Sequence, residues 1–412
     1  MKSRGNRLSP EPAVITGIGL VTPVGTDRES SWQAICEGRS GLRLVKLGDG
    51  MQVVGGPSSI PREDRPEWVL HITERVALEA LQDARLDLNS FDHDRAGSVV
   101  GGSNIPSEHT LSTILANGPD AAVSWETCLP FNPASYIGRQ FQLHGPSLSP
   151  AAACATGLIS VLRAADTIQD GLCDVMFAGC ADASLHRLTV SGFRSMRVLA
   201  EAENPAEAVR PFDRQRRGFA IGEGAAMFVL ERMSHAVARR APIYAVIAGG
   251  ISGGDAYHLT SLDPDPGNLA WQINKVLQQS GVTPDEVDYI NAHGTGTVQN
   301  DLAEAHAIHK AFGPAASKIR ISAIKSIIGH LLTAAGGVEL AITALAVRDG
   351  FIPPTMNLTD PDPECDLNCT PLHGTPYPIL TALKLSIAFG GHFGAAVLRH
   401  PSCYGLENRL AA

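Results

Sequence analysis

The chain has 412 residues and a formal net charge of −9 at pH 7, with 44% hydrophobic and 18% charged residues. This length suffices for one large or two ordinary hydrophobic cores, and the composition is that of a compact α/β protein, which excludes the disordered and fibrous classes. The acidic balance offers no basic field that could displace counterions from a polyanion, so nucleic-acid binding is not expected.

Runs rich in valine, isoleucine and alanine, typical of buried strands, alternate with helical patterns along the chain. In the first half these runs cover 13–25, 96–102, 174–182 and 224–231. In the second half they cover 242–255, 287–297, 319–326, 383–391 and 394–400. Each series closes with a small-residue strand after a glycine-rich turn, which predicts an approximate internal duplication. Because the sequence between the halves is no flexible linker, we expect residues 12–240 and 241–402 to share one packed body.

The stretch SPAAACATGLIS (149–160) places Cys154 at the start of a long apolar segment. The pattern from 154 to 170 predicts a helix that is hydrophobic on most faces and therefore buried. Free amide N–H groups and the dipole at the N-terminus of such a helix stabilise a thiolate, and a lowered thiol pKa is what a cysteine nucleophile requires. The alternative is a small core cysteine without a chemical role.

Two histidines lie at strand–helix junctions, where α/β folds place reactive groups. His293 ends a strand-like run in NAHGTGT, and His330 in KSIIGHLLTAAGG precedes an apolar helix. Each histidine alone would more often be structural, but with Cys154 they form a Cys/His/His set suited to nucleophilic catalysis. Lys325 and Glu339 lie on either side of His330, and a buried lysine is usually tolerated through such a carboxylate partner.

Other charged residues have two interpretations at this stage. Asp301 and Glu304 follow HGTGT and are either partners of the Cys/His/His set or part of a solvated helix face. A basic cluster is either a docking site for an acidic protein or a run of internally paired charges; it comprises Arg210, Arg214, Arg216 and Arg217.

Cellular location and metal binding are predicted from simpler features. The longest apolar run starts at Leu331 and carries Glu339 near its middle, which predicts a buried helix rather than a membrane span. The first eleven residues lack an apolar signal region, so we expect a cytoplasmic protein. The eight cysteines are scattered, as in a protein with reduced thiols. The segment CDLNC (365–369) has no second ligand pair, so no metal site is expected.

Several segments together carry a resemblance to a known family. They are ACATG around Cys154, RPFDRQRRGFAIGEGA (210–225), DAYHLTS (255–261), NAHGTGT, KSIIGHLLTAAGGVE (325–339), IPPTMNL (352–358) and AFGGHFGAAVL (388–398). Through them the chain, from residue 12 to 400, resembles the elongating β-ketoacyl-acyl carrier protein synthases (synthase II type) of the thiolase superfamily. The resemblance implies a duplicated α/β body with five layers, α/β/α/β/α, and a homodimer.

The resemblance also implies a reaction, a decarboxylative Claisen condensation. Cys154 would accept an acyl chain from an acyl carrier protein, and His293 with His330 would decarboxylate the malonyl thioester, supported by Lys325 and Glu339. The amide N–H groups of Cys154 and Phe389 would form the oxyanion hole. Thr260, Thr295 and Thr297 would bind the phosphopantetheine arm of the carrier, and no separate cofactor is implied.

The segment IAFGGHF (387–393) departs from the family's usual FGFGGTN. Ala388 restricts a backbone that glycine would leave mobile, and the rings of His392 and Phe393 are expected to reshape the pocket mouth and the choice of acyl chain. Two alternatives to a fatty-acid enzyme remain: a type II polyketide ketosynthase, and a non-catalytic partner resembling a chain-length factor. The retained Cys154, together with both histidines, favours an active enzyme. A thiolase or an initiating synthase fits less well, because an initiating synthase is expected to carry a Cys/His/Asn set.

Overall fold

The computed structural model describes residues 11–48, 50–62, 68–103, 108–118, 129 and 131–406. The strands in these residues are β1 (Ala13–Val21), β2 (Arg43–Lys46), β3 (Gln52–Gly56), β4 (Ala96–Gly102), β5 (Ser147–Leu148), β6 (Val175–Asp182), β7 (Ile221–Gly222), β8 (Gly224–Arg232), β9 (Ala245–Gly254), β10 (Tyr289–Asn291), β11 (Arg320–Ser322), β12 (Phe351–Ile352), β13 (Thr375–Pro376), β14 (Thr381–Ala388) and β15 (His392–Arg399). The helices are α1 (Arg28–Cys36), α2 (Trp68–Asp83), α3 (Glu108–Asn117), α4 (Asn132–Gln140), α5 (Thr156–Gln169), α6 (Arg187–Ser195), α7 (Met233–Ala238), α8 (Gly267–Gln279), α9 (Val298–Phe312), α10 (Lys325–Ile328) and α11 (Ala335–Asp349).

The largest sheet has ten strands in the order β11-β10-β14-β15-β9-β1-β8-β6-β4-β5. It consists of two series of five, and when the strands of each series are numbered by their appearance in the chain, both follow the order 3-2-4-5-1. In both series the fifth strand, β8 or β15, is antiparallel to its two neighbours, and the other pairs are parallel. The series join where residues 13–15 of β1 pair with 245–247 of β9. This repetition confirms the predicted duplication.

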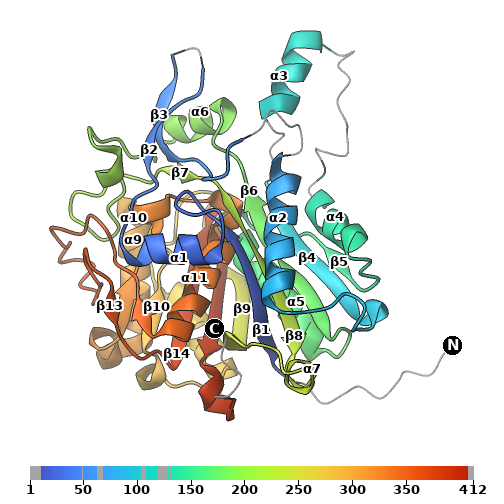
Figure 1. Cartoon of the computed structure of the whole chain (residues 1–412). Coiled ribbons are helices and arrows are strands. Elements are labelled where there is room, and N and C mark those ends of the chain that lie inside the picture. The colour runs from blue at the N-terminus through green and yellow to red at the C-terminus, as the bar shows by residue number, and fades with distance from the viewer. Residues whose placement is uncertain are drawn as a thin grey trace.

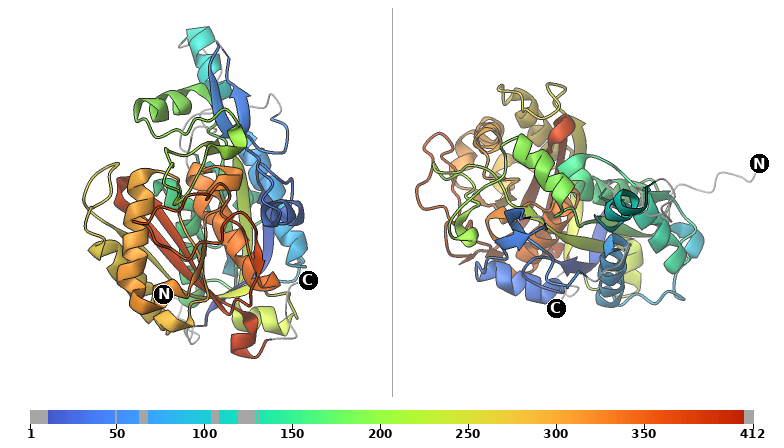
Figure 2. Two further views of the ribbon diagram at one scale, coloured as in Figure 1. Left: turned by 90° about the vertical axis from the view of Figure 1, so that its left-hand side faces the viewer. Right: turned by 90° about the horizontal axis from the view of Figure 1, so that it is seen from above.

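Helices cover both faces of each half of the sheet and produce five layers (Figure 1). On the N-terminal half, α2 packs on β1 and β8, and α4 packs on β4. On the C-terminal half, α8 packs on β9 and β15, and α9 packs on α8. Helices α5 and α11 pack on each other in the central layer, between the two halves. Seen from the side, the blue-to-green half lies beside the orange-to-red half (Figure 2). The five-layer α/β/α/β/α prediction is confirmed.

The two central helices approach each other closely at a pair of glycines. A Cβ atom placed on Gly157 of α5 would lie 2.5 Å from the backbone nitrogen of Gly337 of α11, and one placed on Gly337 would lie 2.4 Å from the sulfur of Cys180. Only glycine permits this backbone contact. Because the contact is near the start of both helices, the residues just before α5 and just before α11 are brought together.

Several smaller expectations can be compared with the structure. The predicted helix over 154–170 begins with the 3₁₀ turn Ala153–Ala155 and continues as α5. The apolar run from Leu331 forms the buried helix α11, as predicted. No helix in the described part of the chain combines the length and the apolar character needed to cross a lipid bilayer. Within the same part, seven cysteines are free thiols, and Cys128 lies outside the described residues.

Candidate active site

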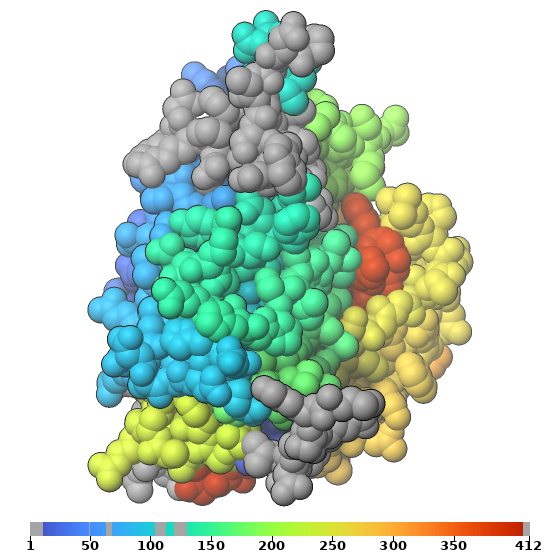
Figure 3. Space-filling model, turned by 90° about the vertical axis from the view of Figure 1, so that its right-hand side faces the viewer, coloured from blue at the N-terminus to red at the C-terminus, as the bar shows by residue number. Residues whose placement is uncertain are grey.

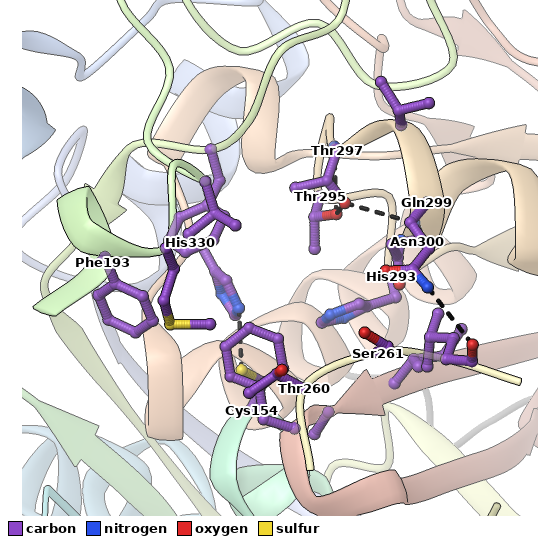
Figure 4. Close-up of a pocket in the computed structure, with 18 of the residues that line it drawn as sticks. Cys154, Phe193, Thr260, Ser261, His293, Thr295, Thr297, Gln299, Asn300 and His330 are labelled. Carbon is purple, nitrogen blue, oxygen red and sulfur yellow. Dashed lines mark hydrogen bonds between the residues drawn. The ribbon is translucent and has the colours of Figure 1, made fainter. Parts of the chain in front are cut away.

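A cavity of about 380 Å³ opens where the loops before α5 and α11 meet. It collects most of the residues that the sequence singled out, including Phe389. The others are Cys154, Thr260, His293, Thr295, Thr297 and His330 (Figure 4). Its walls come from both halves of the chain. The N-terminal half contributes Phe193, near the end of α6, and Phe219, and the C-terminal half contributes residues from the loops around β10, α9 and β14. Residues separated by more than two hundred positions therefore share one cavity.

Cys154 and His330 are in direct contact, since the Nε2 atom of His330 lies 3.0 Å from the sulfur (Figure 4). Burial raises the pKa of Cys154 to about 12, although the Lys325 ammonium lowers it. Burial, assisted by the nearby lysines Lys325 and Lys384, lowers the pKa of His330 well below its usual value. At neutral pH the sulfur is therefore a thiol beside a neutral imidazole, which can accept its proton.

This result corrects one expectation. The helix end was expected to hold the sulfur of Cys154 as a thiolate by itself. At this half-buried position loss of hydration disfavours the charged form, and the pKa of the thiol is raised instead of lowered. His330 was expected to act in decarboxylation, and its contact with the sulfur of Cys154 makes it a candidate for proton transfer as well.

His293 is oriented by Lys325 on α10. The Nζ atom of Lys325 lies 3.2 Å from Nδ1 of His293 and also donates to the carbonyl oxygen of the same residue. An ammonium group can only donate, so Nδ1 must be the acceptor and the ring proton is on Nε2. Burial, with the positive charge of Lys325, lowers the pKa of His293 well below its usual value, and the ring is neutral. The centroids of the His293 and His330 rings lie 5.4 Å apart, and the ring planes are at 83° to each other. His293 thus has an N–H donor and lines the cavity that Cys154 also lines.

The charged residues behind the imidazoles form a buried network. Lys325 and Glu339 make an ion pair, and neither side chain is more than 2% exposed. Glu304 of α9 accepts the backbone N–H groups of His293 at 2.6 Å and Gly294 at 2.8 Å. Asp301 is also buried and accepts the N–H of Phe212 at 2.9 Å. Asp301 and Glu304 are therefore supporting partners of the site, and the solvated-face interpretation is wrong.

The threonines and Phe389 lie on two loops that contact each other. Thr295 and Thr297 share a hydrogen bond of 2.8 Å, and Thr297 also caps α9. The N–H of Gly390 donates to the carbonyl of Leu259 at 2.6 Å, and the N–H of Asp255 donates to that of Gly391 at 2.9 Å. These bonds join the loop that carries Thr260 to the turn that carries Phe389. The C-terminal part of the chain, in red, reaches the surface between the green and yellow segments (Figure 3).

The structure does not place His392 and Phe393 in the cavity lining. Phe393 is 1% exposed and packs in the core between the sheet and α8 and α9. Side chains alternate between the two faces of the sheet along β15, so Phe393 and Gly394 face opposite sides. Gly394 faces α5, since a Cβ atom there would lie 3.2 Å from Leu158. His392 is half-buried, with its ring against Gly390. The prediction that both rings reshape the pocket mouth is therefore wrong for Phe393.

Sequence reasoning missed two groups of residues. Phe193 and Phe219 form a wall of the cavity. Phe219 lies in the segment RPFDRQRRGFAIGEGA (210–225), in which the sequence singled out the arginines, and nothing in the sequence around Phe193 distinguishes it from other core aromatics. Lys384 is fully buried on β14, and its Nζ atom lies 2.7 Å from Glu339. A charged residue inside the apolar run LKLSIA was the available signal for it.

The arginine cluster separates into two kinds. Arg210 and Arg216 pair with Glu207 and Asp362, at 3.2 Å and 2.5 Å. Arg214 lies 3.8 Å from Asp360. Arg217 instead lines the cavity, as does Arg197. Internal pairing therefore explains three members of the cluster and leaves Arg217 at the site.

Known protein families match both parts of the chain. Residues 67–236 match the family described as "Beta-ketoacyl synthase, N-terminal domain". Residues 244–359 match "Beta-ketoacyl synthase, C-terminal domain".

Individual relatives match over nearly the full length. A 3-oxoacyl-[acyl-carrier-protein] synthase 2 from Coxiella burnetii is 36% identical over 408 residues, covering 93% of this chain and 97% of the relative. The ketoacyl synthase alpha subunit of the tetracenomycin polyketide synthase from Streptomyces glaucescens is 35% identical, with 96% and 98% covered. A solved type II polyketide ketosynthase, in complex with its acyl carrier protein, has a TM-score of 0.89 at 33% identity and covers 95% of this chain and 99% of its own. The chain belongs to the β-ketoacyl synthase family, with the thiolase-like fold.

Proposed function

We propose that the chain catalyses the decarboxylative Claisen condensation of a malonyl-acyl carrier protein with an acyl chain held as a thioester on Cys154. The observation that carries the proposal is the contact of 3.0 Å between the sulfur of Cys154 and Nε2 of His330, in a cavity that His293 also lines. A thiol, a proton acceptor and an N–H donor are the groups that the two half-reactions need.

In the first half-reaction the thiol attacks the carbonyl carbon of an acyl thioester. The proton of Cys154 passes to Nε2 of His330, a carbon–sulfur bond forms, and the carrier leaves as its thiol. The negative charge on the former carbonyl oxygen needs N–H donors, and the backbone amides of Cys154 and Phe389 are proposed for this role. Losing one such donor typically costs a few kcal/mol of barrier.

In the second half-reaction the malonyl thioester loses carbon dioxide. The electron pair of the breaking carbon–carbon bond moves into the thioester and produces an enolate, which N–H donation from His293 stabilises. The enolate carbon attacks the carbonyl of the acyl group on Cys154. The sulfur leaves as a thiolate and takes up a proton from solvent, because its first proton left with the carrier thiol. The β-ketoacyl chain is released on the carrier.

The proposed partner is an acyl carrier protein with a phosphopantetheine arm. The cavity lining contains Arg197 and Arg217 and no aspartate or glutamate from the described residues, although the whole chain is acidic. A positively charged cavity favours the approach of an anionic carrier and of the phosphate group on its phosphopantetheine arm. Thr260, Thr295 and Thr297 are proposed to bind the arm, and no further cofactor is proposed.

The assembly is also a proposal. We expect a homodimer whose subunits each consist of the halves 12–240 and 241–402. The relatives with 36% and 35% identity are named a 3-oxoacyl-[acyl-carrier-protein] synthase and a ketoacyl synthase subunit of a polyketide synthase, respectively, so the proposal covers the condensation step that the two names share.

Mass spectrometry after incubation with acylated carrier protein tests the proposal. An acyl adduct on Cys154, followed by β-ketoacyl product when malonyl carrier is added, is the expected result. Cys154→Ala should give neither. Absence of both adduct and product from the unmodified chain, paired with any partner subunit, would support a non-catalytic role of the chain-length-factor kind.

A further inference from the structure

Lys384 is a buried charge that the proposed half-reactions do not use. It lies in the middle of β14, with its side chain 0% exposed, among apolar neighbours. A lysine is almost never fully buried unless a partner compensates its charge, since an unpaired ammonium away from water is very costly. Its position therefore needs an explanation.

The contacts of Lys384 lead to His293. Its Nζ atom lies 2.7 Å from Oε2 of Glu339, whose other oxygen, Oε1, pairs with Lys325. Lys325 in turn donates to Nδ1 of His293. Lys384 also donates to the carbonyl oxygen of Ala292, the residue just before His293, at 3.4 Å. The chain of contacts is Lys384, Glu339, Lys325 and His293.

Within this chain of contacts two lysines share one carboxylate, that of Glu339. Of the other titratable groups around it, Glu304 from α9 also raises the pKa of Lys384, and the rest are Tyr289 from β10, Cys154 before α5, and the imidazoles of His293 and His330. On β15 the residue paired with Lys384 is Ala396, which has no charge. Burial lowers the pKa of Lys384 to about 8, while Glu339 raises it. The positive charge of Lys384 also lowers the pKa of both imidazoles.

We propose that Lys384 is a positioning residue for decarboxylation, which acts through Glu339 and Lys325 to hold His293 with its Nε2–H toward the cavity and keeps a positive charge behind the forming enolate. The inference rests on the proposed function. A fixed charge close to a developing anion, in a site without bulk water, lowers the barrier because it needs no reorganisation during the reaction. Acyl loading passes through Cys154 and His330, which Lys384 affects only through its charge and not through this chain of contacts.

The inference has a pH dependence with a defined sign. A lysine with a lowered pKa is charged below that pKa and loses its proton as the pH rises through it. The positive charge of Lys384 is therefore present at pH 7 and is lost as the pH rises through about 8. Decarboxylation should decline on this alkaline side, while acyl loading should not.

The experiment measures carbon dioxide release from malonyl carrier protein between pH 6.5 and 9.5, and acyl loading by mass spectrometry, for the same preparations. Lys384→Met keeps the length of the side chain without its charge. It should release carbon dioxide about tenfold more slowly at pH 7, without the alkaline decline, and should load acyl chains normally. Lys384→Arg keeps a charge that does not titrate in this range, so its rate should be restored and should not decline up to pH 9.5. Ser386→Ala, two residues along the same face of β14, is the matched control and should behave as the unmodified chain.

An alkaline decline that persists unchanged in Lys384→Met, or equal losses of loading and decarboxylation, would overturn the role of Lys384. If Lys384→Met does not fold, the profile of Lys384→Arg decides, because a decline near pH 8 in that variant cannot come from position 384. An unmodified chain that neither loads acyl chains nor releases carbon dioxide would instead contradict the proposed function.

Discussion

The Nε2 atom of His330 lies 3.0 Å from the sulfur of Cys154, whereas Nδ1 of His293 is occupied by Lys325. The two histidines, which the sequence could not distinguish, thus have different partners. One touches the nucleophile, and the other is held as a donor by an ammonium group. Under the proposed function, this asymmetry makes His330 the proton acceptor in acyl loading and His293 the N–H donor in decarboxylation.

Replacing each histidine by alanine should separate the two half-reactions. His330→Ala removes the proton acceptor of Cys154, so acyl loading should slow by about a hundredfold, and decarboxylation should fall as well. His293→Ala leaves the contact with the sulfur in place, so loading should remain close to normal while carbon dioxide release falls by a similar factor. Loading is measured by mass spectrometry and decarboxylation with malonyl carrier protein. Normal loading in His330→Ala would show that His330 is not needed to ionise Cys154 and would favour the N-terminus of the helix in that role.

The alkylation of Cys154 by iodoacetamide should depend steeply on pH. The pKa of this thiol is raised to about 12, so its reactive thiolate is the minor form at neutral pH and increases as the pH rises. The rate should therefore increase about tenfold per pH unit between pH 7 and 9.5 without a plateau. Labelling of Cys154 is followed by peptide mass spectrometry, and the exposed Cys403 in the same sample provides the reference. A plateau near pH 8 would show that the site does hold a thiolate.

Much of the fold was predictable because local patterns determined it. The run over 96–102 is β4, and the helix over 154–170 is α5 with its preceding turn. The edge strand β5 is only two residues long, and its pattern is too short to recognise. Cys154 and His330 could be picked out as candidates by their position before apolar helices, but their distance depends on the contact between Gly157 and Gly337. That contact belongs to the packing of two helices far apart in the sequence.

The less predictable part of the site depends on which way a side chain faces. Phe393 and Lys384 both lie on strands near the site, and neither orientation follows from composition. Phe393 was expected at the pocket mouth and lies in the core, while Lys384 went unnoticed and lies behind the imidazoles. In both cases the alternation of side chains along the strand determines which face of the sheet the residue is on. Its role can then be predicted only when the elements that pack on each face are known.

Gly391→Ala should disturb the contact between the two loops at the cavity. Gly391 has a φ of +71°, and a Cβ atom there would lie 2.2 Å from Oδ1 of Asp255. Left-handed backbone costs a residue with a side chain about 1–2 kcal/mol, and the clash adds to this cost. Loading from acyl carrier protein should fall about tenfold, because the turn that carries Phe389 shifts. Gly192→Ala in α6, where a Cβ atom meets nothing within 4 Å, is the control and should load normally. Equal loading by Gly391→Ala and Gly192→Ala would show that acyl loading does not depend on this contact between the loops.

Phe393→Asn should affect stability rather than the choice of acyl chain. Phe393 is 1% exposed in the core that α8 and α9 cover, so the change removes a buried ring and introduces an amide without an obvious partner. Large-to-small substitutions of this kind cost about 3–5 kcal/mol of unfolding free energy. His392→Thr, at the half-buried neighbouring position, should cost less than about 1 kcal/mol. Urea unfolding measures both, and loading from carriers with different acyl chains gives the chain-length profile. A core residue that does not touch the substrate cannot select its acyl chain. A changed chain-length profile in Phe393→Asn, with the unfolding free energy unaltered, would therefore show that the ring contacts the substrate.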